Sequence, residues 1–498
     1  MTDMIKRPLS RLWTIENRAG PANIPNYQGL AKAGAASWAF GDRTPIRNPS
    51  NSRYGGFNIA DAIKGERGLP SLPITARYLF TVSEFLRLGR IGCPFDIQVH
   101  FGKCQNPMDF NRGWDKILVL EGADISNWSP DELGALEQSE DAVVNETVDT
   151  NGLDMYEVKR LTMQEIAASQ IVQEVISVVL CDSVACGACG IPSDGVSTFF
   201  AVTVSAGGSP GLPAEVIYSR DKGITLGQTN ISTLGVNEDP TGAACVATFL
   251  VVISNESCSI HYAPLADILD GTETWTEVAT GLVCAAGAPN GIFALDAAHI
   301  WIVGDAGYLY FSDDIESGVS VQDAGVVTAN DLNAVHAYDD QNVVAVGAAN
   351  TVLFSENGGT SWSSITGPAG GIVLNTVFMH GKDEWFIGTA NGRLYYTRDQ
   401  GTTWTEKTFN GSGAGVVRHI TFPTPTVGYM AHDTAAVAGR ILRSVDGGHS
   451  WYVLPEGTGS IPANDRINWI AATQDEVNIF FAGGLADDAA DGILVKGA

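Results

Sequence analysis

Three cysteines near the middle of the chain have a spacing that could bind metal through thiolates. Cys181, Cys186 and Cys189 form the pattern Cys-x4-Cys-x2-Cys, which can supply three corners of an iron–sulfur cluster. A cluster of this kind needs a fourth thiolate, and the next cysteine, Cys245, lies far along the chain. A turn of small residues explains the pattern better, so we predict no metal and no cofactor.

Other residue types that support catalysis are dispersed. Residues 487–492, Asp-Asp-Ala-Ala-Asp-Gly, have the acidic character of a calcium loop but lack its alternation and closing glutamate, so we predict a hairpin turn. The histidines stand alone at expected strand ends or in loops, where packing and surface roles are commoner than base catalysis. Those after residue 200 are His261, His299, His336, His380, His419, His432 and His449. We therefore predict no catalytic residues.

A short pattern recurs in the C-terminal half. Ser355–Trp362, Thr397–Trp404 and Ser444–Trp451 each contain a hydroxyl residue, Asn or Asp two places later, Gly two places further, and a final Trp. The Asn or Asp side chain can accept hydrogen bonds from backbone N–H groups in a tight turn, and the Gly permits a positive φ. Weaker copies begin at Ser219, Ile268 and Ser312. The six copies recur about every 45 residues, the period of a four-stranded propeller blade.

This pattern resembles the Asp box, or bacterial neuraminidase repeat, which forms the turn between the third and fourth strands of a β-propeller blade. The resemblance implies a structural role for Ser219, Asp221, Gly223, Asp270, Trp275, Ser312, Asp314, Ser355, Asn357, Gly359, Trp362, Thr397, Asp399, Gly401, Trp404, Ser444, Asp446, Gly448 and Trp451. We expect the tryptophans to anchor outer strands. A sugar-binding site would instead use non-repeating aromatics such as Tyr262 or Trp301.

Sialidases are Asp-box enzymes, and membership would imply three arginines around a carboxylate, a Tyr–Glu pair and an acidic proton donor. The arginines of the propeller outside the boxes are confined to its late part: Arg393, Arg418, Arg440 and Arg466. The family's Arg-Ile-Pro motif is absent. We therefore predict that the chain is not an enzyme, and keep a sialidase-like glycan hydrolase as the second alternative.

The end of the chain predicts how the propeller closes. Residues 467–473, 477–483 and 492–496 look like three strands, after which the sequence stops. Closed propellers leave no exposed sheet edge. We therefore predict that residues 173–181 supply the missing strand, giving a propeller over 173–498 with seven blades, or six as the alternative.

Charge is distributed unevenly over the 498 residues, whose formal net charge is -27. No Lys or Arg occurs between Lys222 and Lys382. Such an acidic surface repels nucleic acid and anionic membranes. No apolar run is long enough to cross a bilayer, and no signal peptide is apparent. Folding in the cytoplasm and reduced cysteines are therefore expected.

The first part of the chain has a different composition. Residues 1–50 contain Pro21, Pro25, Pro45 and Pro49, which favour an extended arm or loop. Within 51–172, strands are expected over 72–80, 96–102, 114–121 and 155–161, and helices over 82–90 and from the capping residue Ser129 to 137. These elements predict an α+β domain or β-sandwich with one or two helices, in a chain that is mainly β.

The order of elements in residues 1–180 resembles the tail-tube proteins of long-tailed bacteriophages, as does the segment Ile91–Cys104. The resemblance implies a structural virion protein, made in the host cytoplasm, that assembles into stacked homo-oligomeric rings, expected to be hexameric, alongside other tail proteins. The propeller would be displayed outside the tube, with a host-surface glycan as a possible partner. The first alternative is a binding module similar to the Asp-box propellers that assist photosystem II assembly.

Overall fold

The computed structural model divides the chain into two compact units, Met1–Arg160 and Leu161–Ala498. In the first unit it describes residues 11–15, 28–30, 35–36, 43–46, 63–67, 74–79, 95–102, 114–130, 143–151 and 154–159. In the second it describes 161–497 except 162, 167–172, 182–197, 205–212, 236–237, 247, 279–280, 284–286, 369–370, 435–438, 455–460, 462–464, 473–477 and 486–491. The boundary that we predicted at residue 173 lies later than this division.

The described part of the first unit consists of antiparallel strands. The strands are β1 (Arg11–Ile15), β2 (Gln28–Leu30), β3 (Ala35–Ala36), β4 (Arg43–Ile46), β5 (Ile63–Arg67), β6 (Ile74–Leu79), β7 (Phe95–Gly102), β8 (Trp114–Pro130), β9 (Val143–Asn151) and β10 (Asp154–Lys159). Eight of them form one sheet in the order β2-β1-β7-β8-β9-β6-β3, with β10 also paired to β8, while β4 pairs with β5. The long strand β8 pairs with β7 and β10 along its first half and with β9 along its second half.

Several predictions for this unit need correction. Ser129 and Pro130 end strand β8 and do not begin a helix, because their partners Thr147 and Glu146 in β9 hold them in a sheet. Strands β1 and β2 fall within the segment that we predicted to be an arm. The predicted helix over 82–90 and residues 131–137 lie outside the described residues.

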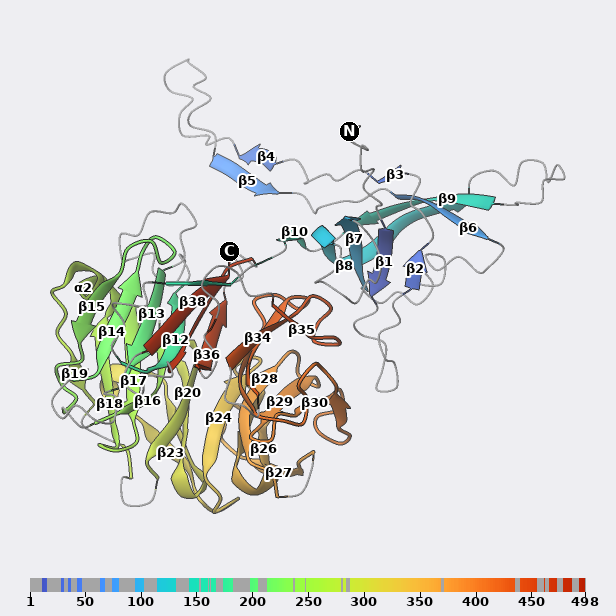
Figure 1. Ribbon diagram of the computed structural model, residues 1–498. Helices are drawn as coiled ribbons and strands as arrows, with labels where there is room; N and C mark the ends of the chain where they lie inside the picture. Colours follow the sequence, from blue (N-terminus) through green and yellow to red (C-terminus); the bar gives the residue numbers. More distant parts are fainter. Residues whose placement is uncertain are drawn as a thin grey trace. The chain divides into compact units, whose positions relative to one another are not determined.

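The second unit is a seven-bladed β-propeller made of four-stranded antiparallel sheets (Figure 1). Blade 1 contains β12 (Val175–Cys181), β13 (Thr198–Thr203), β14 (Glu215–Ser219) and β15 (Gly227–Asn230). Blade 2 contains β16 (Pro240–Val246), β17 (Phe249–Ser254), β18 (Ser259–Pro264) and β19 (Thr276–Glu277). Blade 3 contains β20 (Pro289–Asp296), β21 (His299–Gly304), β22 (Tyr308–Ser312) and β23 (Ser320–Ala324). Blade 4 contains β24 (Leu332–Ala337), β25 (Val343–Gly347), β26 (Thr351–Ser355) and β27 (Ser363–Thr366). Blade 5 contains β28 (Leu374–Met379), β29 (Trp385–Thr389), β30 (Leu394–Thr397) and β31 (Thr405–Lys407). Blade 6 contains β32 (Val416–Thr421), β33 (Gly428–Asp433), β34 (Gly439–Ser444) and β35 (Tyr452–Val453). The prediction of seven blades is confirmed.

Blade 7 closes the ring with a strand from the beginning of the unit. It contains β36 (Arg466–Ala472), β37 (Phe480–Leu485), β38 (Gly492–Gly497) and β11 (Met163–Glu165), and β11 pairs with β38 so that Met163 faces Gly497. The closing strand predicted at 173–181 is wrong, because β12 pairs with β13 as the first strand of blade 1. Strand β11 has three residues, which is too short to give a strand pattern in the sequence.

The hydrophobic core lies between neighbouring blades. Each core cluster combines side chains of two consecutive blades, for example Val344 and Phe354 of blade 4 with Trp385 and Ile387 of blade 5. The cluster that includes Val175, Phe199 and Phe481 joins blade 1 to blade 7. Since every sheet face is buried against another, the ring is held by hydrophobic burial around its circumference.

Candidate functional site

Four corners of the propeller share one set of hydrogen bonds. In the corner at Ser444, the hydroxyl donates to Asp446 Oδ1 (2.7 Å) and accepts from Gly448 N–H (2.8 Å). Asp446 Oδ1 also accepts from Ser450 N–H (2.9 Å). Gly448 has a φ of 81°, which glycine adopts with little strain. Ser219 with Asp221, Ser355 with Asn357, and Thr397 with Asp399 repeat these bonds.

Two corners depart from the repeat. At Ser312 the inserted residues form the 3-10 turn η5 (Ile315–Ser317), and Asp314 caps it by accepting from Glu316 N–H at 3.2 Å. The corner predicted at residue 268 is wrong, because Leu265–Asp270 is helix α2, which ends at Gly271 with a φ of 70°. Asp270 pairs with Arg220 at 2.8 Å instead of capping a turn.

The corner tryptophans pack between blades. Trp362 lies in a cluster with Trp301 and Leu309 of the preceding blade, and Trp451 lies in a cluster with Phe386 and Leu394 of blade 5. Trp451 is 5% exposed, and Trp275, which follows helix α2, is 4% exposed, whereas Trp404 is only half-buried. Trp301, considered above for a sugar site, is 1% exposed and donates its Nε1–H to Gly358 O (3.0 Å), so its role is in packing.

A β-bulge occurs at the same place in the inner strand of every blade. The bulged residues are Ile176, Thr241, Asn290, Asn333, Asn375, Arg418 and Asn468. The Asn and Thr side chains donate to the carbonyl that precedes the bulge of the next blade, over 2.9 to 3.3 Å: Thr241 to Pro289, Asn290 to Leu332, Asn333 to Leu374, Asn375 to Val417 and Asn468 to Val175. We call these five interactions the inner belt.

At the centre of the ring lies a cavity of about 310 Å³ lined by the inner strands. Aromatic rings of successive blades line part of it. The ring centroid of His336 lies 4.3 Å from that of Phe293 and 4.4 Å from that of Phe378. His419 stacks on Trp469 with 3.8 Å between the ring centroids. His336 Nδ1 accepts from Met379 N–H (3.3 Å). Among the described residues, His419 Nδ1 is a buried ring nitrogen without a hydrogen-bond partner. The lining of this cavity combines such aromatic and apolar residues with polar ones, among them Asn290, Thr376 and Arg418.

Burial controls the charge of these histidines. Desolvation, with a smaller contribution from the nearby His419, lowers the pKa of His336 to about 3. Desolvation also lowers the pKa of His419 to about 3, although its hydrogen bond with the backbone of Ile470 opposes this. Both rings are therefore neutral at physiological pH.

The arginines weighed for a carboxylate-binding trio interact with other groups of the protein. Arg418 Nε donates to Asp433 Oδ2 (2.6 Å), and the positive charge of Arg466 also acts on Asp433. Arg393 pairs with Glu406 on the outer part of blade 5. Arg440 faces His432, whose pKa burial lowers to about 4. Arg418 and Arg466 therefore both act on Asp433, whereas Arg393 and Arg440 act on Glu406 and His432.

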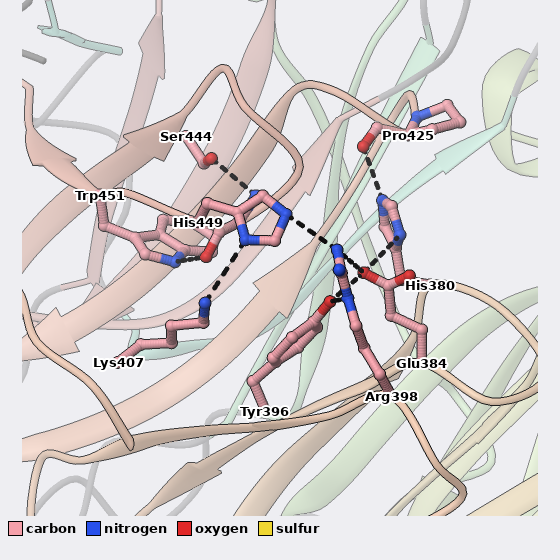
Figure 2. A network of polar contacts seen from close by, with 10 residues as sticks. His380, Glu384, Tyr396, Arg398, Lys407, Pro425, Ser444, His449 and Trp451 are labelled. Atoms are coloured by element: carbon pink, nitrogen blue, oxygen red, sulfur yellow. Dashed lines mark hydrogen bonds and ion pairs between the residues drawn. The ribbon is translucent and has the colours of Figure 1, made fainter. Parts of the chain in front are cut away.

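The structure also assembles a polar cluster between blades 5 and 6 that the sequence did not indicate (Figure 2). We define the blade 5–6 cluster as His380, Glu384, Tyr396, Arg398, Lys407 and His449. Tyr396 donates to Glu384 Oε1 (2.5 Å), and His380 Nε2 donates to Pro425 O (2.6 Å). Arg398 Nη2 lies 3.2 Å from His449 Nε2 and Lys407 Nζ lies 3.4 Å from His449 Nδ1.

The two acidic groups of the blade 5–6 cluster, Glu384 and Tyr396, differ in protonation. Burial raises the pKa of Glu384, but hydrogen bonding and the charges of His380 and Arg398 outweigh burial, so the pKa is lowered. Burial raises the pKa of Tyr396, and the charge of Glu384 adds to the rise. Glu384 is therefore ionised and Tyr396 keeps its proton. Residues from four separate segments contribute (380–384, 396–398, 407 and 449), which explains why sequence spacing gave no signal for the cluster.

Other predicted site residues are accounted for as follows. Cys181 ends strand β12, while Cys186, Cys189 and residues 487–491 lie outside the described residues. His261 is buried and bonded to Ser259 and Thr233 (2.7 and 2.8 Å). His299 bonds to Asp296 (2.8 Å). Tyr262 packs edge-on against Phe249 at 5.2 Å between centroids.

Cysteine oxidation differs from our expectation. Cys245 and Cys258 are each disulfide-bonded, so the prediction of reduced thiols is wrong for these two residues, whose spacing in the sequence gave no indication of pairing. Within the part of the chain that the structure describes, no group of three or more His, Cys, Asp or Glu side chains could hold a metal ion. No described helix is long and apolar enough to span a membrane.

Comparisons with known proteins identify the class of fold. A virginiamycin B lyase from Staphylococcus aureus, solved with quinupristin, is 10% identical, with 68% of this chain and 100% of that chain covered at a TM-score of 0.51. A streptogramin B lyase is 10% identical over 67% and 97% of the two chains at 0.50. YCF48 from Cyanidioschyzon merolae is 14% identical over 67% and 98% at 0.49. No family model and no curated protein matches the sequence. The two lyases share the propeller fold with this chain, and this likeness concerns the fold alone.

Proposed function

We propose that this chain is a non-enzymatic structural protein of a bacteriophage tail, whose first unit forms stacked rings and whose propeller is displayed as a binding module. The observation that carries the proposal is the division at Arg160 and Leu161 into two compact units. Each unit builds its sheets from its own strands. A self-contained propeller can be added to an assembling subunit without entering its sheets.

Two further features support this assignment. The long strand β8, paired to different strands along its two halves, suits the sandwich-like subunit implied by the resemblance of residues 1–180 to tail-tube proteins. The absence of Lys and Arg between Lys222 and Lys382 gives the propeller an acidic surface, and like-charged propellers repel one another. Assembly would therefore depend on the first unit, with the propellers kept apart.

The test compares the full chain with residues 161–498. We expect the full chain to form rings or stacked rings in negative-stain electron microscopy and to sediment as an oligomer, hexameric if the tail-tube resemblance holds. The 161–498 fragment should be folded and monomeric because blade 7 closes with its own β11. A full chain that stays monomeric at high concentration would contradict the proposal. A fluorogenic sialoside assay should show no hydrolysis.

The central cavity favours a second candidate, a binding module that acts without assembly. Ligand sites combine apolar and aromatic walls with a few placed polar groups, and the rings of Phe293, His336 and Phe378 would suit a flat aromatic ligand. Indole should then raise the melting temperature of the propeller, and Ala334→Phe, which adds a ring to the cavity lining, should remove that shift. A glycan array separately tests host-surface adhesion.

A further inference from the structure

Lys407 and Arg398 contact opposite nitrogens of one imidazole in the blade 5–6 cluster. Arg398 belongs to the corner of blade 5, Lys407 ends strand β31, and His449 belongs to the corner of blade 6. As Figure 2 shows, the ring of His449 lies between the two basic side chains, with Arg398 Nη2 at 3.2 Å and Lys407 Nζ at 3.4 Å. The same imidazole must therefore satisfy two neighbours that are normally donors.

The hydrogen atoms allow one consistent arrangement. Arginine stays protonated and has no acceptor, so His449 Nε2 must accept from Arg398. A neutral imidazole then carries its hydrogen on Nδ1, where it points at Lys407 Nζ. A charged ammonium group cannot accept this hydrogen bond, whereas an uncharged amine can. Protonating His449 would put a third positive charge between the other two.

The surroundings of Lys407 favour the uncharged amine. Its Nζ lies 4.6 Å from the centre of the Tyr396 ring, and the Arg398 guanidinium lies 5.4 Å from the same centre. Burial lowers the pKa of Lys407 and the Arg398 charge lowers it further, against the opposing effects of Asp446 and Glu384. Burial holds the pKa of His449 well below its ordinary value, and the positive charge of Arg398 acts in the same direction. Glu384 is already engaged by Tyr396.

We propose that His449 holds Lys407 as an uncharged, nucleophilic amine, and that Lys407 is a site of covalent acylation by activated acyl compounds. The amine lone pair attacks the acyl carbon, a nitrogen–carbon bond forms, the bond to the leaving group breaks, and the ammonium proton passes to solvent. With acetic anhydride the products are acetyl-lysine and acetate. Lys407 is half-buried, and the proposal requires that a small reagent reach its amine.

Trace labelling with acetic anhydride across a pH series tests the proposal on the full chain. Acetylation at Lys407 is quantified by peptide mass spectrometry relative to Lys382, a half-exposed lysine paired with Glu356 at 3.5 Å. The matched variant is His449→Thr, because Thr occupies the corresponding position, 360 or 402, of two other corners. We expect Lys407 labelling at pH 7.5 to fall at least about tenfold in His449→Thr, since one pKa unit changes the uncharged fraction about tenfold. Labelling of Lys382 should not change.

The pH profile in the unaltered protein gives an independent result if His449→Thr fails to fold. The midpoint of Lys407 labelling should lie below the ordinary lysine range. A profile in the ordinary range, or equal Lys407 profiles in the two folded proteins, would overturn the proposal. If labelling at pH 7.5 instead increased in His449→Thr, shielding of the amine by the ring would be its main effect, and the assigned hydrogen bond would be wrong.

Discussion

The outer corners and the inner belt of the propeller both repeat from blade to blade, but they stabilise the ring differently. A corner is local: Ser444, Asp446 and Gly448 bond within one turn. The inner belt is non-local, since Asn333 of blade 4 donates to Leu374 of blade 5. The corners define each blade, and the belt aligns one blade with the next. Substitutions at the corners and at the centre of the ring should therefore change the unfolding free energy by different amounts and with a different dependence on pH.

Trp451→Ala should have the largest effect. The side chain is 5% exposed, contacts Phe422 and donates to Gly448 O (3.0 Å). Truncation of a buried tryptophan leaves a cavity and costs about 3 to 5 kcal/mol of unfolding free energy. Urea unfolding measures the loss. Trp404→Ala is the control at a half-buried corner and should cost less; equal losses would mean that corner burial does not set the stability.

Acidification should weaken the centre of the ring before the corners. His336 has a native pKa of about 3, below its unfolded value of about 6.5. The unfolded chain therefore binds more protons below that value, so stability present above pH 6.5 is lost as pH falls toward 3. Each such histidine contributes a slope of up to about 1.4 kcal/mol per pH unit.

His336→Phe tests this slope. The neighbouring rings are Phe293 and Phe378, so a phenyl ring suits the site. Between pH 6.5 and 4.5, the slope of the unfolding free energy against pH should decrease by the contribution of one histidine, up to about 1.4 kcal/mol per pH unit. Phe378→Leu, which removes no titrating group, should lower stability at every pH and keep the slope. An unchanged slope in His336→Phe would show that groups other than His336 cause the loss of stability in acid.

Asn333→Ala should have an intermediate effect that reports on the belt. It removes the 2.9 Å bond to Leu374 O and leaves that carbonyl without this donor, at a cost of about 1 to 2 kcal/mol. The measurement is equilibrium unfolding of the 161–498 fragment. Exposed Asn410 provides the control, since Asn410→Ala should change stability little. A neutral Asn333→Ala would show that hydrophobic packing alone aligns these blades.

Arg220→Ala should have the smallest effect. Its ion pair with Asp270 is solvent-exposed, with side-chain exposures of 44% and 68%, and exposed pairs contribute about 0.5 kcal/mol. A double-mutant cycle with Asp270→Ala isolates the pair. A coupling larger than about 1.5 kcal/mol would show that this contact links blade 1 to helix α2 more strongly than exposure allows.

The sequence alone determined the four regular corners, because each is made within about eight residues whose types satisfy its hydrogen bonds and its positive φ. It predicted seven blades and kept six as the alternative, because the number depended on a closing strand. Predictions from local sequence were wrong where the same residues could form another element. Helix α2 formed in place of one corner, and Ser129 became part of strand β8 instead of beginning a helix. Only the tertiary structure decided the closing strand β11, the inner belt and the contact of Lys407 with His449. Each of these joins residues that are distant in the chain. The type of a side chain does not indicate which distant residue the closed ring places beside it.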